Sequence, residues 1–79
     1  MSPTVFKYKN YRFLFFSREE KRIHIHVTSP EGEAKFWIGQ EVVLVKNYGF
    51  TARQIRAIQK VIEAHKDDIK KAWNKHFGS

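Results

Sequence analysis

The sequence predicts an α+β domain: an antiparallel β-meander of four to five strands, followed by one long C-terminal amphipathic helix packed on one sheet face. Two patterns indicate this fold. Residues 1–46 alternate apolar and polar side chains with period two and are rich in β-branched and aromatic residues. Residues 50–77 instead repeat apolar side chains every three or four positions. With 79 residues, we expect a single domain spanning 1–79.

Short alternating segments predict the strands: TVFKYK, YRFLFFS, RIHIHVTS and AKFWI. In the third, the isoleucines and valine share one face, whereas His24 and His26 share the other. In the fourth, Phe36 and Ile38 point inward. EVVLV after Gly39 fits a short apolar strand, with a helical turn as the alternative. Because the connections between strands are short, a meander is the economical topology.

The helix is predicted to follow Thr51, which fits an N-cap because Gln54 completes a capping box. Its apolar positions form a stripe that should lie across the sheet: Ile55, Ile58, Ile62, His65, Ile69, Ala72, Trp73 and Phe77. We expect Trp73 in the core, because an aromatic residue at helical spacing ordinarily buries its area.

One helix covers one face of a sheet, so apolar residues on the second face need another cover. In FLFF, Phe13 and Phe15 point to one side, and Leu14 and Phe16 to the other. Trp37 should join Leu14 and Phe16 in an apolar patch away from the helix. A small monomer rarely leaves such a patch bare, so we predict a homodimer or a dedicated protein partner. The alternative is that loops or a curled sheet bury these residues.

Composition narrows the function classes. Fifteen Lys and Arg against eight Asp and Glu give a net charge of +7, which favours anionic partners such as RNA or an acidic protein. Solubility alone is the plainer interpretation. The absence of cysteine excludes disulfides and thiolate metal sites. We find neither a signal peptide nor an apolar run near the roughly 20 residues of a membrane span, so we expect a soluble cytoplasmic protein without membrane contact.

The paired histidines, His24 and His26, are the candidate catalytic residues. Their Cβ atoms should lie roughly 6.5–7 Å apart on one strand face. That spacing permits two metal ligands, but a site needs a third, for which the candidates are His65, His76 or a carboxylate such as Glu33 or Glu41. His65 and His76 are expected on the helix side, so the third ligand is missing. We therefore predict no metal and no cofactor.

Acid–base chemistry is a second hypothesis for the histidine pair. Flanked by basic side chains, two histidines could cleave RNA without a metal, one accepting and one donating a proton. A plain solvated or dimer-buried strand face is the third. No phosphate loop or cysteine nucleophile accompanies them, which favours a non-catalytic role but leaves the question open. The expected RNA or partner contacts are Arg12, Arg22, His24, His26, Lys35 and Trp37.

Several motifs occur in order along the chain: SPTVF, YRFLFFS, IHIHV, GEAKFWI and GFTARQIRAIQKVIEAHKDDIKKAWNKHFG. Together, from Pro3 to Gly78, they resemble the small bacterial proteins of domain of unknown function family 4160. Where that family commonly has one or two prolines before the first histidine, this chain has Arg22 and Ile23. The resemblance implies a component of a small two-gene operon with suspected toxin–antitoxin behaviour, and it assigns no activity to any residue.

These observations leave two hypotheses for function. The first is an interaction component of a toxin–antitoxin-like pair, which holds a neighbouring-gene protein or its own copy through the second sheet face. The alternative is an RNA-binding or RNA-cleaving toxin that uses His24 and His26 together with Lys and Arg side chains.

Overall fold

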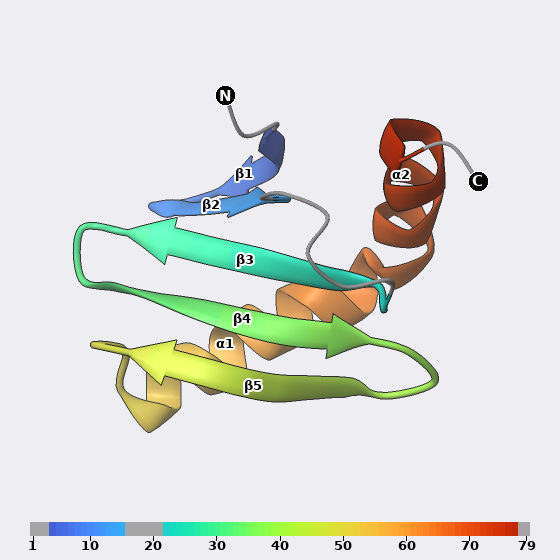
Figure 1. Cartoon of the computed structure of the whole chain (residues 1–79). Coiled ribbons are helices and arrows are strands. Elements are labelled where there is room, and N and C mark those ends of the chain that lie inside the picture. The colour runs from blue at the N-terminus through green and yellow to red at the C-terminus, as the bar shows by residue number, and fades with distance from the viewer. Residues whose placement is uncertain (1–3, 16–21, 78–79) are drawn as a thin grey trace.

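The computed structural model describes residues 4–15 and 22–77 (Figure 1). Within them, a five-stranded antiparallel sheet precedes two helices, in the order β1 (Thr4–Tyr8), β2 (Tyr11–Leu14), β3 (His24–Ser29), β4 (Gly32–Ile38), β5 (Val42–Tyr48), α1 (Ala52–Ala64) and α2 (Lys66–Phe77). The strands lie in chain order in the sheet, so β1 and β5 are its edges. The predicted α+β meander is confirmed, and EVVLV belongs to a strand that ends at Tyr48.

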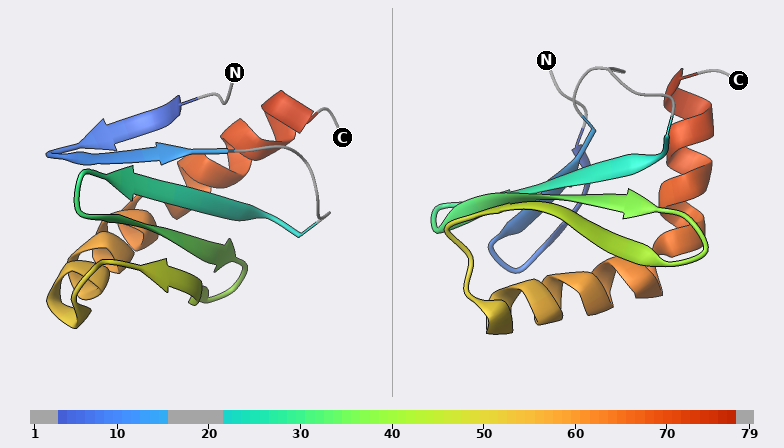
Figure 2. Two further views of the ribbon diagram at one scale, coloured as in Figure 1. Left: turned by 60° about the vertical axis from the view of Figure 1, so that its left-hand side comes forward. Right: turned by 60° about the horizontal axis from the view of Figure 1, so that its bottom comes forward.

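The single long helix that we predicted is wrong, because the helix breaks at His65. This residue has φ −110° and ψ 16° and ends α1. Helix α1 lies under one face of the sheet, and α2 turns away from it and rises past the end of the sheet where β3 begins (Figure 2). A straight helix would be about 40 Å long and would carry its last turns beyond the sheet. The bend instead keeps Ile69 and Trp73 buried.

The core lies between the helices and the sheet face that they cover. The side chains that alternation placed inward are buried there, and Trp73 joins them as predicted. The largest fully buried members are Phe13, Phe15, Phe36, Ile25, Ile58, Ile62, Ile69 and Val27.

The connection from β5 to α1 is closely fitted. Gly49 has a φ of +95°, and a Cβ on Gly32 would lie 2.1 Å from the backbone oxygen of Tyr48, so both positions require glycine. The predicted capping box is confirmed. The Gln54 backbone N–H donates to Thr51 Oγ1 at 3.1 Å, and the Thr51 N–H donates to Gln54 Oε1 at 2.9 Å.

We call the sheet face that α1 does not cover the open face. Residues paired across antiparallel strands point to the same side, and the register pairs Leu14 with His26, His24 with Trp37, and Trp37 with Val43. The face therefore comprises Arg12, Leu14, His24, His26, Thr28, Glu33, Lys35, Trp37, Val43, Lys46 and Tyr48.

Candidate interaction surface on the open face

His24 is held rigidly at the start of β3. Its side chain is only 2% exposed, and its Nδ1 lies 2.8 Å from the backbone oxygen of Arg22. Because a carbonyl oxygen only accepts hydrogen bonds, Nδ1 must carry the hydrogen and donate it. Only Nε2 of this ring remains for other chemistry.

The ring of His24 is packed among three others. The ring centroids of His26, Trp37 and Trp73 lie 5.4, 5.8 and 4.9 Å from it, all edge-on. Trp73 belongs to α2, so the expectation that the histidine face lies away from the helix is wrong for His24. The physical reason is the break at His65, which places α2 beside the end of the sheet, where Trp73 packs against the His24 ring.

Two cations lie over the half-buried ring of Trp37. Arg22 Cζ is 4.7 Å and Lys35 Nζ is 4.8 Å from the ring centroid, within the range of cation–π attraction. We call Arg22, His24, His26, Lys35 and Trp37 the Trp37 cluster. Lys35 is also paired directly with Lys46 across β4 and β5. The cluster therefore concentrates positive charge beside the β5 edge.

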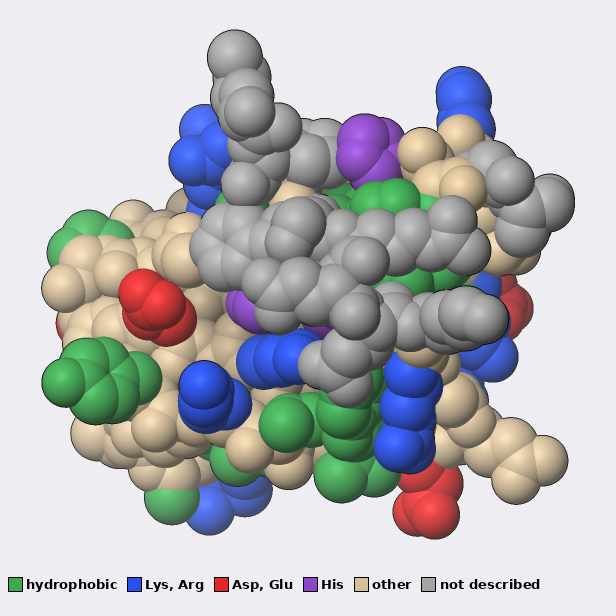
Figure 3. All heavy atoms as spheres, in the orientation of Figure 1, with side chains coloured by type: hydrophobic (Ala, Val, Ile, Leu, Met, Phe, Trp, Pro, Cys, Tyr) green, Lys and Arg blue, Asp and Glu red, His purple; other side chains and the backbone are tan. Residues whose placement is uncertain are grey.

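Strand β5 exposes an apolar surface next to this cluster. Val43, Leu44, Val45 and Tyr48, which we call the β5 strip, are 46%, 38%, 40% and 79% exposed. Val43 and Tyr48 lie on the open face, whereas Leu44 is paired with the buried Phe36 and lies on the other face, and Val45 is unpaired. The strip therefore follows the edge of the sheet. In Figure 3, Lys and Arg side chains lie among hydrophobic ones over the lower half of the open face, where β4 and β5 lie, with acidic side chains toward the left and the lower right. This combination of apolar and cationic side chains is suited to holding an acidic partner.

The predicted apolar patch differs from the surface observed. Leu14 is only 4% exposed, so its side chain offers a partner almost no area. Phe16 lies outside the described residues, and Trp37 is half-buried under its two cations. Among the described residues, the exposed large apolar side chains are Tyr8 and the β5 strip, and our interpretation of the sequence did not single out this strip. A signal was present, because the last strand of a meander is necessarily an edge and EVVLV is apolar at four consecutive positions.

The remaining candidates lie apart from the Trp37 cluster. Arg12 is on β2, where its Nε donates to Thr4 Oγ1 at 2.7 Å. His65 stacks on Phe6 with ring centroids 4.7 Å apart. His76, on α2, lies near the ring of Phe15. Over residues 4–15 and 22–77, no three His, Asp or Glu side chains come together as a metal-binding set.

The geometry of the histidines limits their chemistry. A phosphodiester would need to approach Nε2 of His24, but that side chain is almost completely enclosed. His26 is half-buried and more accessible. The cluster is therefore better arranged to bind an anionic surface through Arg22 and Lys35 than to transfer protons between two histidines.

Comparison with known proteins places the chain in a family. A family model described as "Domain of unknown function (DUF4160)" matches residues 10–74. No curated protein and no solved structure matches the chain. As far as the described residues extend, neither helix is long and apolar enough to cross a membrane.

Proposed function

The chain belongs to the DUF4160 family of domains of unknown function, and on that premise we propose that it is an interaction component of a toxin–antitoxin-like two-gene system. Its partner is the product of the neighbouring gene. The observation that carries this proposal is the β5 strip, an exposed apolar surface on an edge strand. Edge strands of this kind are sites where another chain docks.

The charge of the surface favours an acidic partner. The chain has a net charge of +7, and the Trp37 cluster and Lys46 border the β5 strip. An acidic protein would be attracted to this surface, whereas a second copy would be repelled.

The form of β5 also argues against self-pairing. Val45 is an extra residue between the pairs Phe36–Leu44 and Lys35–Lys46, and so forms a bulge. Bulges and edge lysines both hinder edge-to-edge pairing of sheets. We therefore place the neighbouring-gene protein ahead of the homodimer as the occupant of the β5 strip.

Co-purification tests this proposal. The tagged chain is co-expressed with the product of the neighbouring gene, as wild type and as the double variant Val43→Glu/Val45→Glu. Because the variant places two carboxylates on the apolar strip beside an acidic partner, we expect the complex to be lost while the chain stays folded by circular dichroism.

The matched control is Ala57→Glu/Ala64→Glu, which adds the same charge at exposed positions of α1. It should retain the partner. Failure of the wild-type chain to co-purify with the neighbouring-gene product contradicts the proposal, and so does retention of the partner by the β5 variant.

RNA contact is the second candidate function, and the Trp37 cluster favours it. Arg22 and Lys35 could contact phosphates, and an aromatic ring between cations is common where nucleic acid binds. RNA cleavage by His24 and His26 has less support, because His24 is enclosed.

A further inference from the structure

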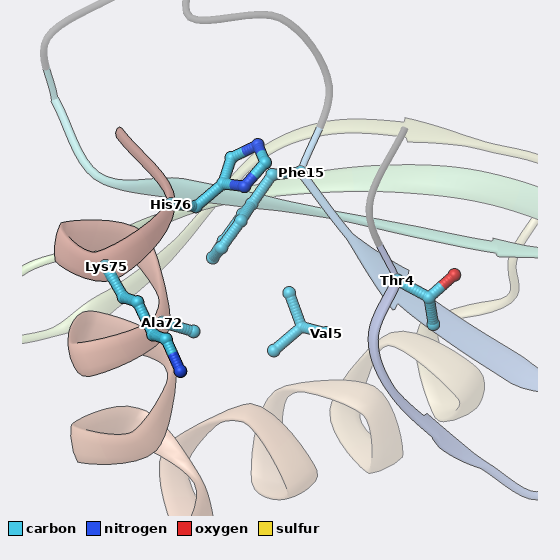
Figure 4. A pocket seen from close by; sticks show the side chains of 6 residues that line it. All are labelled: Thr4, Val5, Phe15, Ala72, Lys75 and His76. Atoms are coloured by element: carbon cyan, nitrogen blue, oxygen red, sulfur yellow. The ribbon is translucent and has the colours of Figure 1, made fainter. Parts of the chain in front are cut away.

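A separate pocket of about 400 Å³ lies between β1, the residue after β2, and α2. Its lining residues are Thr4, Val5, Phe15, Ala72, Lys75 and His76, shown in Figure 4. The pocket is at the β1 edge of the sheet, and the β5 strip is at the opposite edge. It is therefore independent of the proposed interaction surface.

The pocket results from the bend at His65. Because α2 rises at the end of the sheet instead of lying across it (Figure 2), the pocket lies between this helix and β1. Val5 and Ala72 point into the pocket from opposite sides (Figure 4). Phe15 forms the wall and is itself fixed by Trp73 and Phe77, whose ring centroids lie 5.3 and 5.8 Å away. The apolar part of the pocket is thus formed by one core residue, Phe15, and by Val5 and Ala72, which are half-buried against the core.

The polar part of the lining is cationic or neutral. Lys75 and His76 come from the last turn of α2. The Thr4 hydroxyl already accepts a hydrogen bond from Arg12 Nε. Among the residues that the structure describes, none of those lining the pocket is acidic. An apolar pocket with the Lys75 ammonium group on one side selects a ligand with a hydrocarbon part and a negative charge.

We propose that this pocket binds a small apolar carboxylic acid as its carboxylate. The hydrocarbon part lies between Val5, Phe15 and Ala72, and the carboxylate meets the ammonium group of Lys75 at the rim. A phosphate is a poorer fit, because a strongly hydrated dianion requires several converging donors, and Lys75 supplies a single point charge.

Titration of the full chain with hexanoate tests the proposal, followed by calorimetry and by Trp fluorescence, since Trp73 packs on the Phe15 wall. Hexanol and hexylammonium are the matched probes, because they keep the hydrocarbon and lose or reverse the charge. We expect saturable hexanoate binding, about fivefold weaker hexanol binding, and still weaker hexylammonium binding.

Variants locate the site. Lys75→Gln should weaken hexanoate binding about fivefold, whereas Lys71→Gln removes the same charge from an exposed position of α2 outside the pocket and should leave it unchanged. Ala72→Leu fills the cavity and should weaken hexanoate and hexanol alike, by about tenfold. The absence of saturable hexanoate binding overturns the proposal, as do hexylammonium binding of equal strength and equal effects of Lys75→Gln and Lys71→Gln.

Discussion

At the scale of single residues, His24 is a structural side chain of the Trp37 cluster. Its ring fills the space between Trp37 and Trp73, and its Nδ1 hydrogen satisfies the Arg22 carbonyl. Removing the ring leaves a cavity and an unpaired carbonyl, so His24→Ala should lower the free energy of unfolding by about 2–4 kcal/mol. Urea denaturation measures this loss.

His26→Ala is the comparison for that prediction. His26 shares the face but is only half-buried, so we expect its loss to cost less, about 1 kcal/mol. Equal urea midpoints for the His24 variant and the wild type would contradict the structural role assigned to His24.

The cations over Trp37 give a prediction for RNA. If Arg22 and Lys35 contact phosphates, Arg22→Gln/Lys35→Gln should reduce the dependence of the logarithm of affinity on the logarithm of salt concentration by about two. Lys60→Gln/Lys71→Gln removes equal charge from exposed positions of the helices and should change the slope less. Fluorescence anisotropy with a labelled RNA at several salt concentrations measures the slopes. Identical slopes for the two variants exclude the Trp37 cluster as the RNA contact.

Residue alternation predicted much of the candidate site and missed its packing. It placed His24, His26 and Trp37 on one face, and the register confirms this. It could not predict the contact between His24 and Trp73, because that contact depends on where α2 passes the sheet. It also could not predict that Leu14 is buried, since burial on the second face depends on tertiary neighbours rather than on strand phase.

At the scale of elements, the apolar periodicity of the sequence did not predict the break between α1 and α2. The apolar spacing continues through Ile62, His65 and Ile69 without proline or glycine, so the local pattern favours one helix. Asp67 and Asp68 were the available signal, because acidic residues are favoured in the first turn of a new helix. The break itself follows from the limited extent of the sheet, which no local pattern encodes.

The close approach between Gly32, at the start of β4, and Tyr48, at the end of β5, gives a prediction for stability. A Cβ on Gly32 would meet the Tyr48 oxygen at 2.1 Å, and backbone cannot move aside as a side chain can. Gly32→Ala should therefore lower the free energy of unfolding by about 1–3 kcal/mol. Gly39→Ala is the control, because its nearest neighbour is 3.9 Å away, and it should change stability by about 0.5 kcal/mol or less. Urea midpoints compare the two, and similar losses would show that the close approach at Gly32 is not the cause.

At the scale of the whole molecule, the helices lie against one face of the sheet and at its end, and function is expected on the other face. The helices leave uncovered an apolar edge strand, β5, beside the cations over Trp37. The net charge of the chain is +7. A domain of 79 residues has a modest core, so contact with a partner surface would add to its stability. Both considerations favour a role in which the chain acts bound to an acidic protein.

Hydrogen–deuterium exchange of the chain alone and in complex with the neighbouring-gene product tests this account most directly. We predict slower exchange in the complex over residues 37–48, where the β5 strip and Trp37 lie, and unchanged exchange in β1 and α2. Protection confined to β1 and α2, or no protection over residues 37–48 in a saturated complex, would contradict the claim that the β5 strip holds the partner.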